Sequence, residues 1–204
     1  MKLYYAPGAC SLSPHIVLRE AGLPVELVKV DLRAKKTEGG EDFSTINPKG
    51  SVPAVGFDDG GVLTEGAAIV QFIADKAPAK KLAPANGTKE RVRLQEWLNY
   101  VASEMHKGIG QLFNPAMPDD YKTAVKQGLA ARQFPYLEKA LAGRDYIMGE
   151  FSVVDAYLFT VLNWTNLHKI DLSAFPNITA YMKRMAARPA VQEAMKAEGL
   201  LKAA

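Results

Sequence analysis

This sequence has a single cysteine, a low net charge and no long apolar run. The 204 residues include one cysteine, Cys10, so the chain cannot form an internal disulfide or a multi-cysteine metal site. The 25 basic and 22 acidic side chains give a net charge of +3, which is too small to indicate binding to nucleic acid or to a membrane surface. Hydrophobic residues make up 48% of the chain and charged residues 23%, which is the balance of an ordinary globular protein.

Signals for secretion and for membrane insertion are also missing. A Pro-Gly pair at residues 7–8 interrupts the start of the chain before an apolar signal region forms, and the longest uncharged apolar-rich run near the C-terminus, at residues 156–168, is too short to span a bilayer. His15, His106 and His168 share no metal-ligand spacing, so we predict no metal and no cofactor. We expect a cytoplasmic protein whose single thiol stays reduced.

The distribution of turn-forming residues divides the chain into two parts. Residues 1–80 carry 9 of the 16 glycines and 6 of the 12 prolines, set among short apolar runs that favour alternating strands and helices. Residues 81–88 have the composition of a linker, and the pattern from residue 89 onward is helical. We therefore predict an α/β domain at residues 1–80 and an all-helical domain at residues 89–204.

The first domain is expected to alternate strands with helices. The expected strands are at residues 3–5, 25–30, 52–57 and 62–64, and the expected helices at residues 11–21 and 67–77. Ser11 or Ser13 would cap the first helix and Gly22 would end it. The order implies a parallel pair joined by a right-handed crossover, then an irregular segment, then an antiparallel hairpin covered by a helix.

Apolar side chains of the second domain recur at the spacing of one helix face. The first such stripe consists of Leu94, Trp97, Leu98, Val101, Met105, Ile109 and Leu112. A second helix is expected at residues 121–141, and the pairs Phe175-Pro176 and Arg188-Pro189 mark further helix starts. Ser152 and Asp155 have the spacing of a capping box, which would open the most apolar helix of the chain.

Cys10 lies where the first strand is expected to pass into the first helix. A thiol at a helix N-terminus faces unpaired amide groups and the positive end of the helix dipole, and both favour the thiolate. The spacing Cys10-x-x-Ser13 is that of a monothiol site in which serine replaces a resolving cysteine. The alternative is an inert, buried cysteine, because free cysteine is among the most buried residue types.

Two further motifs in the first domain suit a small peptide ligand. Val52-Pro53 precedes an apolar strand, and a cis bond there would leave the Val52 backbone free to dock an extended peptide. Glu65 and Gly66 lie at a strand-to-helix transition. Free amide groups at that helix start would bind a carboxylate, and the Glu65 carboxylate would bind an ammonium.

Together these motifs resemble the glutathione transferase family. The start Lys-Leu-Tyr-Tyr-x-Pro-Gly-Ala-Cys-Ser and the triplet Glu104-Met105-His106 are similar to the bacterial beta class, and the resemblance covers essentially the whole chain. It implies a thioredoxin-like β-α-β-β-β-α domain followed by a C-terminal helical bundle. It also implies a homodimer that uses glutathione as a co-substrate.

The resemblance assigns specific residues to glutathione. The glutathione-binding residues it implies are Cys10, Lys35, Val52, Pro53, Glu65, Gly66, Asn99, Ser103, Glu104 and His106. Within this set the catalytic residues would be Cys10, which faces the glutathione sulfur and forms a mixed disulfide with it, and His106, which reaches toward that sulfur. Two positions depart from the family pattern: residue 66 is Gly where Ser is usual, and residue 51 is Ser where Gln is frequent.

The implied glutathione contacts divide by the parts of the tripeptide. The Val52 backbone, next to a cis Pro53, would pair with the cysteinyl unit. Glu65 and the amide of residue 66 would hold the γ-glutamyl end, and Lys35 would approach the glycyl carboxylate.

The second substrate is expected to be a small apolar electrophile. Its candidate pocket residues are Tyr5, Phe113, Tyr157, Trp164 and Leu167. At helical or strand spacing such residues are more often part of a core, and a lone helical histidine such as His106 is more often a surface or structural residue. Tyr5 and Ser11 are alternative stabilisers of a thiolate, because other classes of the family use a Tyr or Ser hydroxyl near this loop.

The leading hypothesis is a detoxifying enzyme that transfers alkyl or aryl groups to the glutathione sulfur. The first alternative is glutathione-dependent thiol-disulfide exchange at Cys10, for which the Cys10-x-x-Ser13 spacing is suited. The second alternative is a non-catalytic scaffold of the same fold, which the departures at Ser51 and Gly66 favour.

Overall fold

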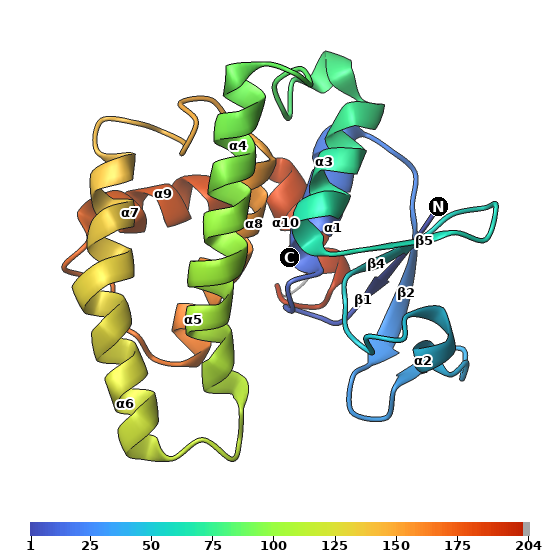
Figure 1. Cartoon of the computed structure of the whole chain (residues 1–204), viewed down its shortest axis with the longest axis horizontal. Helices are drawn as coiled ribbons and strands as arrows, with labels where there is room; N and C mark the ends of the chain where they lie inside the picture. Colours follow the sequence, from blue (N-terminus) through green and yellow to red (C-terminus); the bar gives the residue numbers. More distant parts are fainter. Residues whose placement is uncertain (202–204) are drawn as a thin grey trace. The chain divides into compact units, whose positions relative to one another are not determined.

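The structure is a computed structural model that describes residues 1–201 (Figure 1). The chain forms two compact units: unit 1 contains Met1–Ala83 together with residues 188–201, and unit 2 contains Pro84–Ala187. The predicted division at residues 81–88 therefore lies close to the first boundary. The end of the chain differs from the prediction, because residues 188–201 belong with the α/β unit and not with the helical one.

Unit 1 is built on a five-stranded mixed sheet in the order β3-β2-β1-β4-β5. The strands are β1 (Lys2–Tyr5), β2 (Glu26–Asp31), β3 (Lys36–Thr37), β4 (Ala54–Gly56) and β5 (Val62–Thr64). β1 pairs parallel to β2, whereas β4 pairs antiparallel to both β1 and β5, which confirms the predicted parallel pair and hairpin. The short β3 and the one-turn helix α2 (Phe43–Ile46) lie in the stretch that was predicted to be irregular.

Three longer helices and a 3₁₀ turn complete unit 1. They are α1 (Leu12–Ala21), α3 (Gly66–Lys76), α10 (Pro189–Ala197) and the turn η1 (Pro78–Lys80). α1 packs against both α3 and α10 (Figure 1). The predicted stop at Gly22 is confirmed, because its left-handed φ of 68° ends α1. Ser11 occupies the N-cap position of α1, but its side chain makes no capping hydrogen bond.

The docking of α10 on α1 explains why the end of the chain belongs to unit 1. Val191 and Ala194 of α10 are fully buried. At the start of the helix, Arg188 Nε donates to Glu20 Oε1 at 2.8 Å. Apolar burial and this ion pair both join α10 to the first helix of the α/β unit.

Unit 2 is entirely helical in the residues described. Its elements are α4 (Lys89–Tyr100), η2 (Val101–His106), α5 (Lys107–Gly110), η3 (Gln111–Phe113), α6 (Asp119–Gly128), η4 (Leu129–Gln133), α7 (Phe134–Leu141), α8 (Val153–Leu167) and α9 (Pro176–Ala186). The predicted helical stretches along the first stripe and at residues 121–141 are confirmed, but each contains a π-helical segment, η2 or η4. The predicted helix starts at Pro176 and Pro189 are also confirmed. No helix of residues 1–201 has both the length and the apolar character needed to cross a membrane.

The predicted capping box at the start of α8 is present and fully buried. Asp155 Oδ2 accepts from the Ser152 backbone N–H at 2.9 Å, and Ser152 Oγ accepts from the Val154 N–H at 3.3 Å. The box also binds two other segments. Asp155 Oδ1 accepts from the Ile147 N–H at 3.0 Å, and the Tyr181 hydroxyl of α9 donates to the Asp155 carbonyl at 3.0 Å.

Burial gives this box a pH dependence. It raises the pKa of Asp155 from 3.8 to about 6, although the hydrogen bonds from Ile147 and Ser152 act in the opposite direction. The folded protein therefore binds this proton more tightly than the unfolded chain does. The stabilisation due to the proton is complete below pH 4 and is lost as the pH rises through about 6.

We expect this titration to be visible in a comparison with Asp155→Asn, which does not titrate. The free energy of unfolding of the wild type, minus that of the variant, should fall by about 2 kcal/mol between pH 4 and pH 7. Urea denaturation at a series of pH values measures both quantities. A difference that stays constant over this range would contradict the proposed protonation of the buried carboxyl group.

Candidate functional site

Cys10 lies in unit 1 between the end of β1 and the start of α1, as the sequence predicted. Its Sγ donates to the Val52 carbonyl oxygen at 3.1 Å. The Val52-Pro53 peptide bond is cis, which confirms the predicted isomer. The structure therefore brings together Cys10 and the Val52-Pro53 motif, which are 42 positions apart in sequence.

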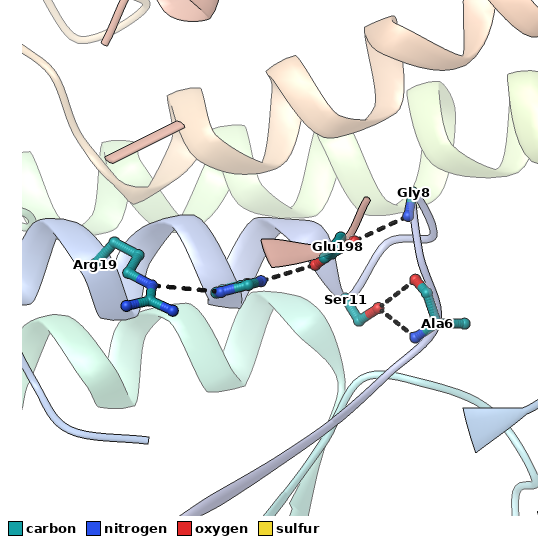
Figure 2. Close-up of polar contacts among 6 residues, drawn as sticks. Ala6, Gly8, Ser11, Arg19 and Glu198 are labelled. Carbon is teal, nitrogen blue, oxygen red and sulfur yellow. Dashed lines mark hydrogen bonds and ion pairs between the residues drawn. The ribbon is translucent and has the colours of Figure 1, made fainter. Parts of the chain in front are cut away.

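The loop that carries Cys10 is held by a serine hydroxyl. Ser11 Oγ accepts from the Ala6 N–H at 3.1 Å and lies 3.2 Å from the Ala6 carbonyl, to which it donates (Figure 2). This buried pair of contacts joins the first turn of α1 to the end of β1. It also explains why Ser11 does not cap α1, because its hydroxyl is already used by Ala6.

A second contact to the loop comes from the end of the chain. Glu198 Oε2 accepts from the Gly8 N–H at 2.9 Å (Figure 2). The other oxygen, Oε1, lies 2.8 Å from His15 Nδ1, and both side chains are fully buried. Arg19 Nε donates to His15 Nε2 at 3.4 Å, so the proton of His15 lies on Nδ1 and is donated to Glu198. The sequence offered no signal for Glu198, because the contact depends on how α10 docks.

Tyr5, an expected pocket residue and alternative thiolate stabiliser, is buried at the end of β1. Its ring lies 6.3 Å from that of His15. Burial, and secondarily the negative charge of Glu198, raise the pKa of the Tyr5 hydroxyl. Tyr5 is therefore a proton donor in this environment and not a source of a phenolate.

The two charged residues predicted to bind the ends of the tripeptide both have partners in unit 1. Lys35 is exposed and its Nζ donates to the Gly50 carbonyl at 2.6 Å. Glu65 precedes α3 with a left-handed φ of 69°, and its Oε1 accepts from Lys49 Nζ at 2.6 Å. Lys49 also donates to Thr64 Oγ1 at 3.0 Å. Sequence reasoning missed Lys49, although it lies in the same motif as Val52.

Four candidate residues of unit 2, His106, Phe113, Tyr157 and Trp164, form an aromatic cluster. His106 Nδ1 lies 2.7 Å from the Tyr157 hydroxyl. The Trp164 ring lies 5.0 Å from that of His106 and 5.4 Å from that of Phe113. Tyr157 and Trp164 are buried, whereas Phe113 is 48% exposed. The cluster therefore has a buried part and one ring, that of Phe113, that is accessible from solvent.

The remaining candidates of unit 2 are exposed. Asn99 lies near the end of α4, and Ser103 and Glu104 lie in the π-helical segment η2 with His106. Leu167, at the end of α8, is 66% exposed. π-Helical segments within α-helices occur frequently at functional sites.

The geometry thus places the site candidates in two groups. Unit 1 holds Tyr5, Cys10, Lys35, Val52, Pro53, Glu65 and Gly66, and unit 2 holds Asn99, Ser103, Glu104, His106, Phe113, Tyr157, Trp164 and Leu167. Within residues 1–201, no three His, Cys, Asp or Glu side chains are grouped so that they could hold a metal ion.

Comparison with known families decides the relationship. The sequence model of the glutathione S-transferase N-terminal domain matches residues 8–76, and that of the glutathione S-transferase C-terminal domain matches residues 100–189. The chain belongs to the glutathione S-transferase family. The predicted fold, a thioredoxin-like domain followed by a helical domain, and the predicted enzyme class are confirmed.

Relatives that are similar over nearly the whole chain include bacterial transferases. Glutathione S-transferase GstA of Escherichia coli O157:H7 is 50% identical, with 98% of this chain and all of the relative covered. A beta-class enzyme of Sphingomonas chungbukensis is 48% identical with a TM-score of 0.95, and a sphingomonad transferase solved with glutathione is 50% identical with a TM-score of 0.94. Each of these two alignments covers 98% of this chain and 100% of the solved chain. The predicted likeness to the beta class is confirmed.

The contacts of Glu198 should contribute strongly to the stability of this transferase. In Glu198→Gln, an amide N–H₂ group must replace one of the two acceptor oxygens, so either Gly8 or His15 loses its acceptor. We expect the free energy of unfolding to fall by about 1–3 kcal/mol in urea denaturation.

Glu193→Gln is the matched control, because Glu193 is exposed and lies on α10, the helix that Glu198 directly follows. It should leave the free energy of unfolding within about 0.5 kcal/mol of the wild type. Equal stabilities of the two variants would contradict the role given to the buried carboxylate.

Proposed function

We propose that the protein conjugates the thiolate of glutathione to small apolar electrophiles, as a cytoplasmic detoxifying enzyme. The observation that carries the proposal is the contact of 3.1 Å between Cys10 Sγ and the Val52 carbonyl oxygen. It brings the thiol next to the backbone that is proposed to pair with the cysteinyl unit of glutathione. Glu65, at the start of α3, supplies the carboxylate that the ammonium of a tripeptide needs. The relative solved with glutathione, at 50% identity, supports the same ligand.

In this proposal the residues of unit 1 bind and orient glutathione. The Val52 backbone pairs with the cysteinyl unit, Glu65 binds the γ-glutamyl ammonium, and Lys35 binds the glycyl carboxylate. Lys35 is exposed and its partner in the structure is a neutral carbonyl, so a carboxylate is a stronger acceptor than the one it leaves. Asn99, Ser103 and Glu104 supply further polar contacts to glutathione.

His106 is proposed to stabilise the reacting thiolate. Its Nδ1 lies 2.7 Å from the Tyr157 hydroxyl. If that hydroxyl donates, the ring proton of a neutral His106 lies on Nε2, and in this proposal it is donated to the sulfur. Tyr157 is then a positioning residue, while Phe113, Trp164 and Leu167, with Tyr5, form the pocket for the electrophile.

These groups together supply enough energy to lower the pKa of the glutathione thiol. Each pKa unit requires about 1.4 kcal/mol of preferential stabilisation of the anion. A helix N-terminus contributes about 0.3–1 kcal/mol. One hydrogen bond to the charged sulfur contributes about 1.5–3 kcal/mol, so the donor from His106 is the larger contribution.

Thiol-disulfide exchange is a second candidate function, because Cys10 Sγ lies next to the Val52 backbone, which is proposed to pair with the cysteinyl unit of glutathione. The Cys10 thiolate would attack the glutathione sulfur of a mixed disulfide and release the other thiol as leaving group. A second glutathione thiolate would then attack the Cys10–glutathione disulfide, yielding oxidised glutathione and reduced Cys10. Ser13 cannot act as a resolving thiol, so the second glutathione is required.

We also propose a homodimer, as the family resemblance implies. Sedimentation equilibrium measures its mass directly, and a mass of one chain at micromolar concentration would contradict it. The cytoplasm suits the proposed activity, because its reduced glutathione pool supplies the co-substrate.

Cys10→Ala separates the two candidate reactions. Conjugation of a chloronitroaromatic substrate should persist within about threefold, because the reacting thiolate belongs to glutathione, whereas reduction of a glutathione mixed disulfide should be lost. Ser13→Ala is the control for the same helical turn, and both activities should survive it.

A Cys10→Ala protein that binds glutathione but no longer conjugates would overturn this assignment. If the wild type neither binds immobilised glutathione nor conjugates, the protein is a non-catalytic scaffold and the proposed function is wrong.

The pH dependence of kcat/KM tests His106. Loss of one hydrogen bond to the thiolate in His106→Ala should raise the apparent pKa of the reaction by about one to two units and lower the rate at pH 7. Tyr157→Phe removes only the hydroxyl that orients His106. The apparent pKa of the reaction in this variant should therefore also rise, but by less than in His106→Ala. A His106→Ala profile that coincides with that of the wild type would show that His106 is structural.

A further inference from the structure

We propose that Lys49 and Glu65 together form a receptor for the zwitterionic amino-acid end of glutathione, in which Lys49 binds the α-carboxylate. The inference rests on the proposed function and deepens it, because it assigns a residue that the family resemblance left out. Sequence reasoning placed Glu65 and the amide of residue 66 at this end of the ligand and gave no role to Lys49.

The first observation is the position of the Lys49 ammonium. Its Nζ lies 2.6 Å from Glu65 Oε1 and 3.0 Å from Thr64 Oγ1. Thr64 ends β5 and Glu65 precedes α3, so the long Lys49 side chain crosses from another loop to the helix start. The Lys49 ammonium is therefore already hydrogen-bonded to the carboxylate that is proposed to bind the ligand ammonium.

The second observation is the charge pattern that a ligand would meet. The α-ammonium and the α-carboxylate of the γ-glutamyl unit are bonded to the same carbon atom. When Glu65 binds the ammonium, a nearby lysine without an anionic partner would repel it. When Lys49 binds the carboxylate, positive and negative groups alternate through protein and ligand, so both charges of the ligand are matched.

Opening the Lys49–Glu65 ion pair costs little free energy, because both side chains are exposed. The side chains of Lys49 and Glu65 are 54% and 69% exposed. Exposed pairs contribute little to stability, so the ligand can separate them and make two charged contacts in place of one. An ammonium has three N–H donors, and Thr64 can keep one while Lys49 turns from Glu65 to the ligand.

Gly66, the first residue of α3, explains why a lysine donor is needed at this end of the ligand. Residue 66 is Gly, so no side-chain hydroxyl is present at the first position of the helix. The backbone amides of residues 66 and 67 can still bind a carboxylate there. Lys49 supplies the side-chain donor that glycine lacks, and it supplies it with a full positive charge.

The test compares two ligands by isothermal titration calorimetry. One is glutathione, and the other is γ-aminobutyryl-cysteinyl-glycine, which lacks only the α-carboxylate. In Lys49→Met the Kd for glutathione should rise about tenfold, which is the effect of losing one charged hydrogen bond. The Kd for the analogue should not rise, because Lys49 has no carboxylate to bind in that complex.

Lys2→Met is the matched control variant. Lys2 forms a similarly exposed ion pair with Glu26 at 3.3 Å, with the two side chains 49% and 61% exposed. Its loss removes the same charge from unit 1 but should leave both Kd values unchanged. Adding Gly66→Ser to Lys49→Met should restore part of the glutathione affinity.

Four outcomes would overturn the proposal. Tighter binding of glutathione by Lys49→Met would show that Lys49 only competes for Glu65. An equal loss for both ligands, or an equal loss in Lys2→Met, would show a general effect of charge. If the wild type binds glutathione and Lys49→Met binds it equally well, the receptor is wrong although the proposed function stands; if the wild type does not bind glutathione, the proposed function itself fails.

Discussion

The buried carboxylate of Glu198 satisfies polar groups from two segments at the other end of the chain. It accepts from the Gly8 N–H, 190 positions away, and from His15, in a place where neither side chain has access to water. A buried donor without an acceptor costs about 1–3 kcal/mol, so the docked end of the chain stabilises this conformation of the loop. Because Cys10 lies in this loop, the geometry of the proposed site depends on that contact.

The proposed chemistry uses groups that this framework holds in place. Ser11 joins the first turn of α1 to the end of β1, which sets the position of Cys10 beside the Val52 carbonyl. Glu65 is held at the start of α3, where the helix dipole favours an anionic ligand group. A peptide with a thiol in its middle and a zwitterion at one end matches this order of groups. Glutathione has that chemistry.

Local features of the fold could be predicted from the sequence because they depend on neighbouring residues. The hairpin, the stop at Gly22 and the capping box of Ser152 and Asp155 each require a few residues at fixed spacing. The π-helical segments were not predicted, because apolar spacing does not distinguish one widened turn from an ordinary helix. The placement of residues 188–201 was also missed, since it depends on tertiary packing against α1.

In the candidate site, too, the positions marked by local sequence could be predicted, whereas the contacts made by tertiary packing could not. Cys10, Val52 and Glu65 were predictable because each lies at a strand or helix boundary that the sequence marks. The Lys49–Glu65 ion pair and the Glu198–Gly8 contact join residues 16 and 190 positions apart, and no periodicity indicates such contacts. The Tyr157 hydroxyl beside His106 is similar, because 51 positions separate the two residues.

The pKa of the glutathione thiol bound to the protein tests the central claim most directly. Ultraviolet absorbance of the thiolate, recorded against pH for glutathione bound to the Cys10→Ala variant, reports this pKa without interference from a protein thiol. The account predicts a pKa well below the value of about 8.5 that is typical of a free thiol. A bound thiol that titrates at the free value would contradict the claim that this protein activates glutathione.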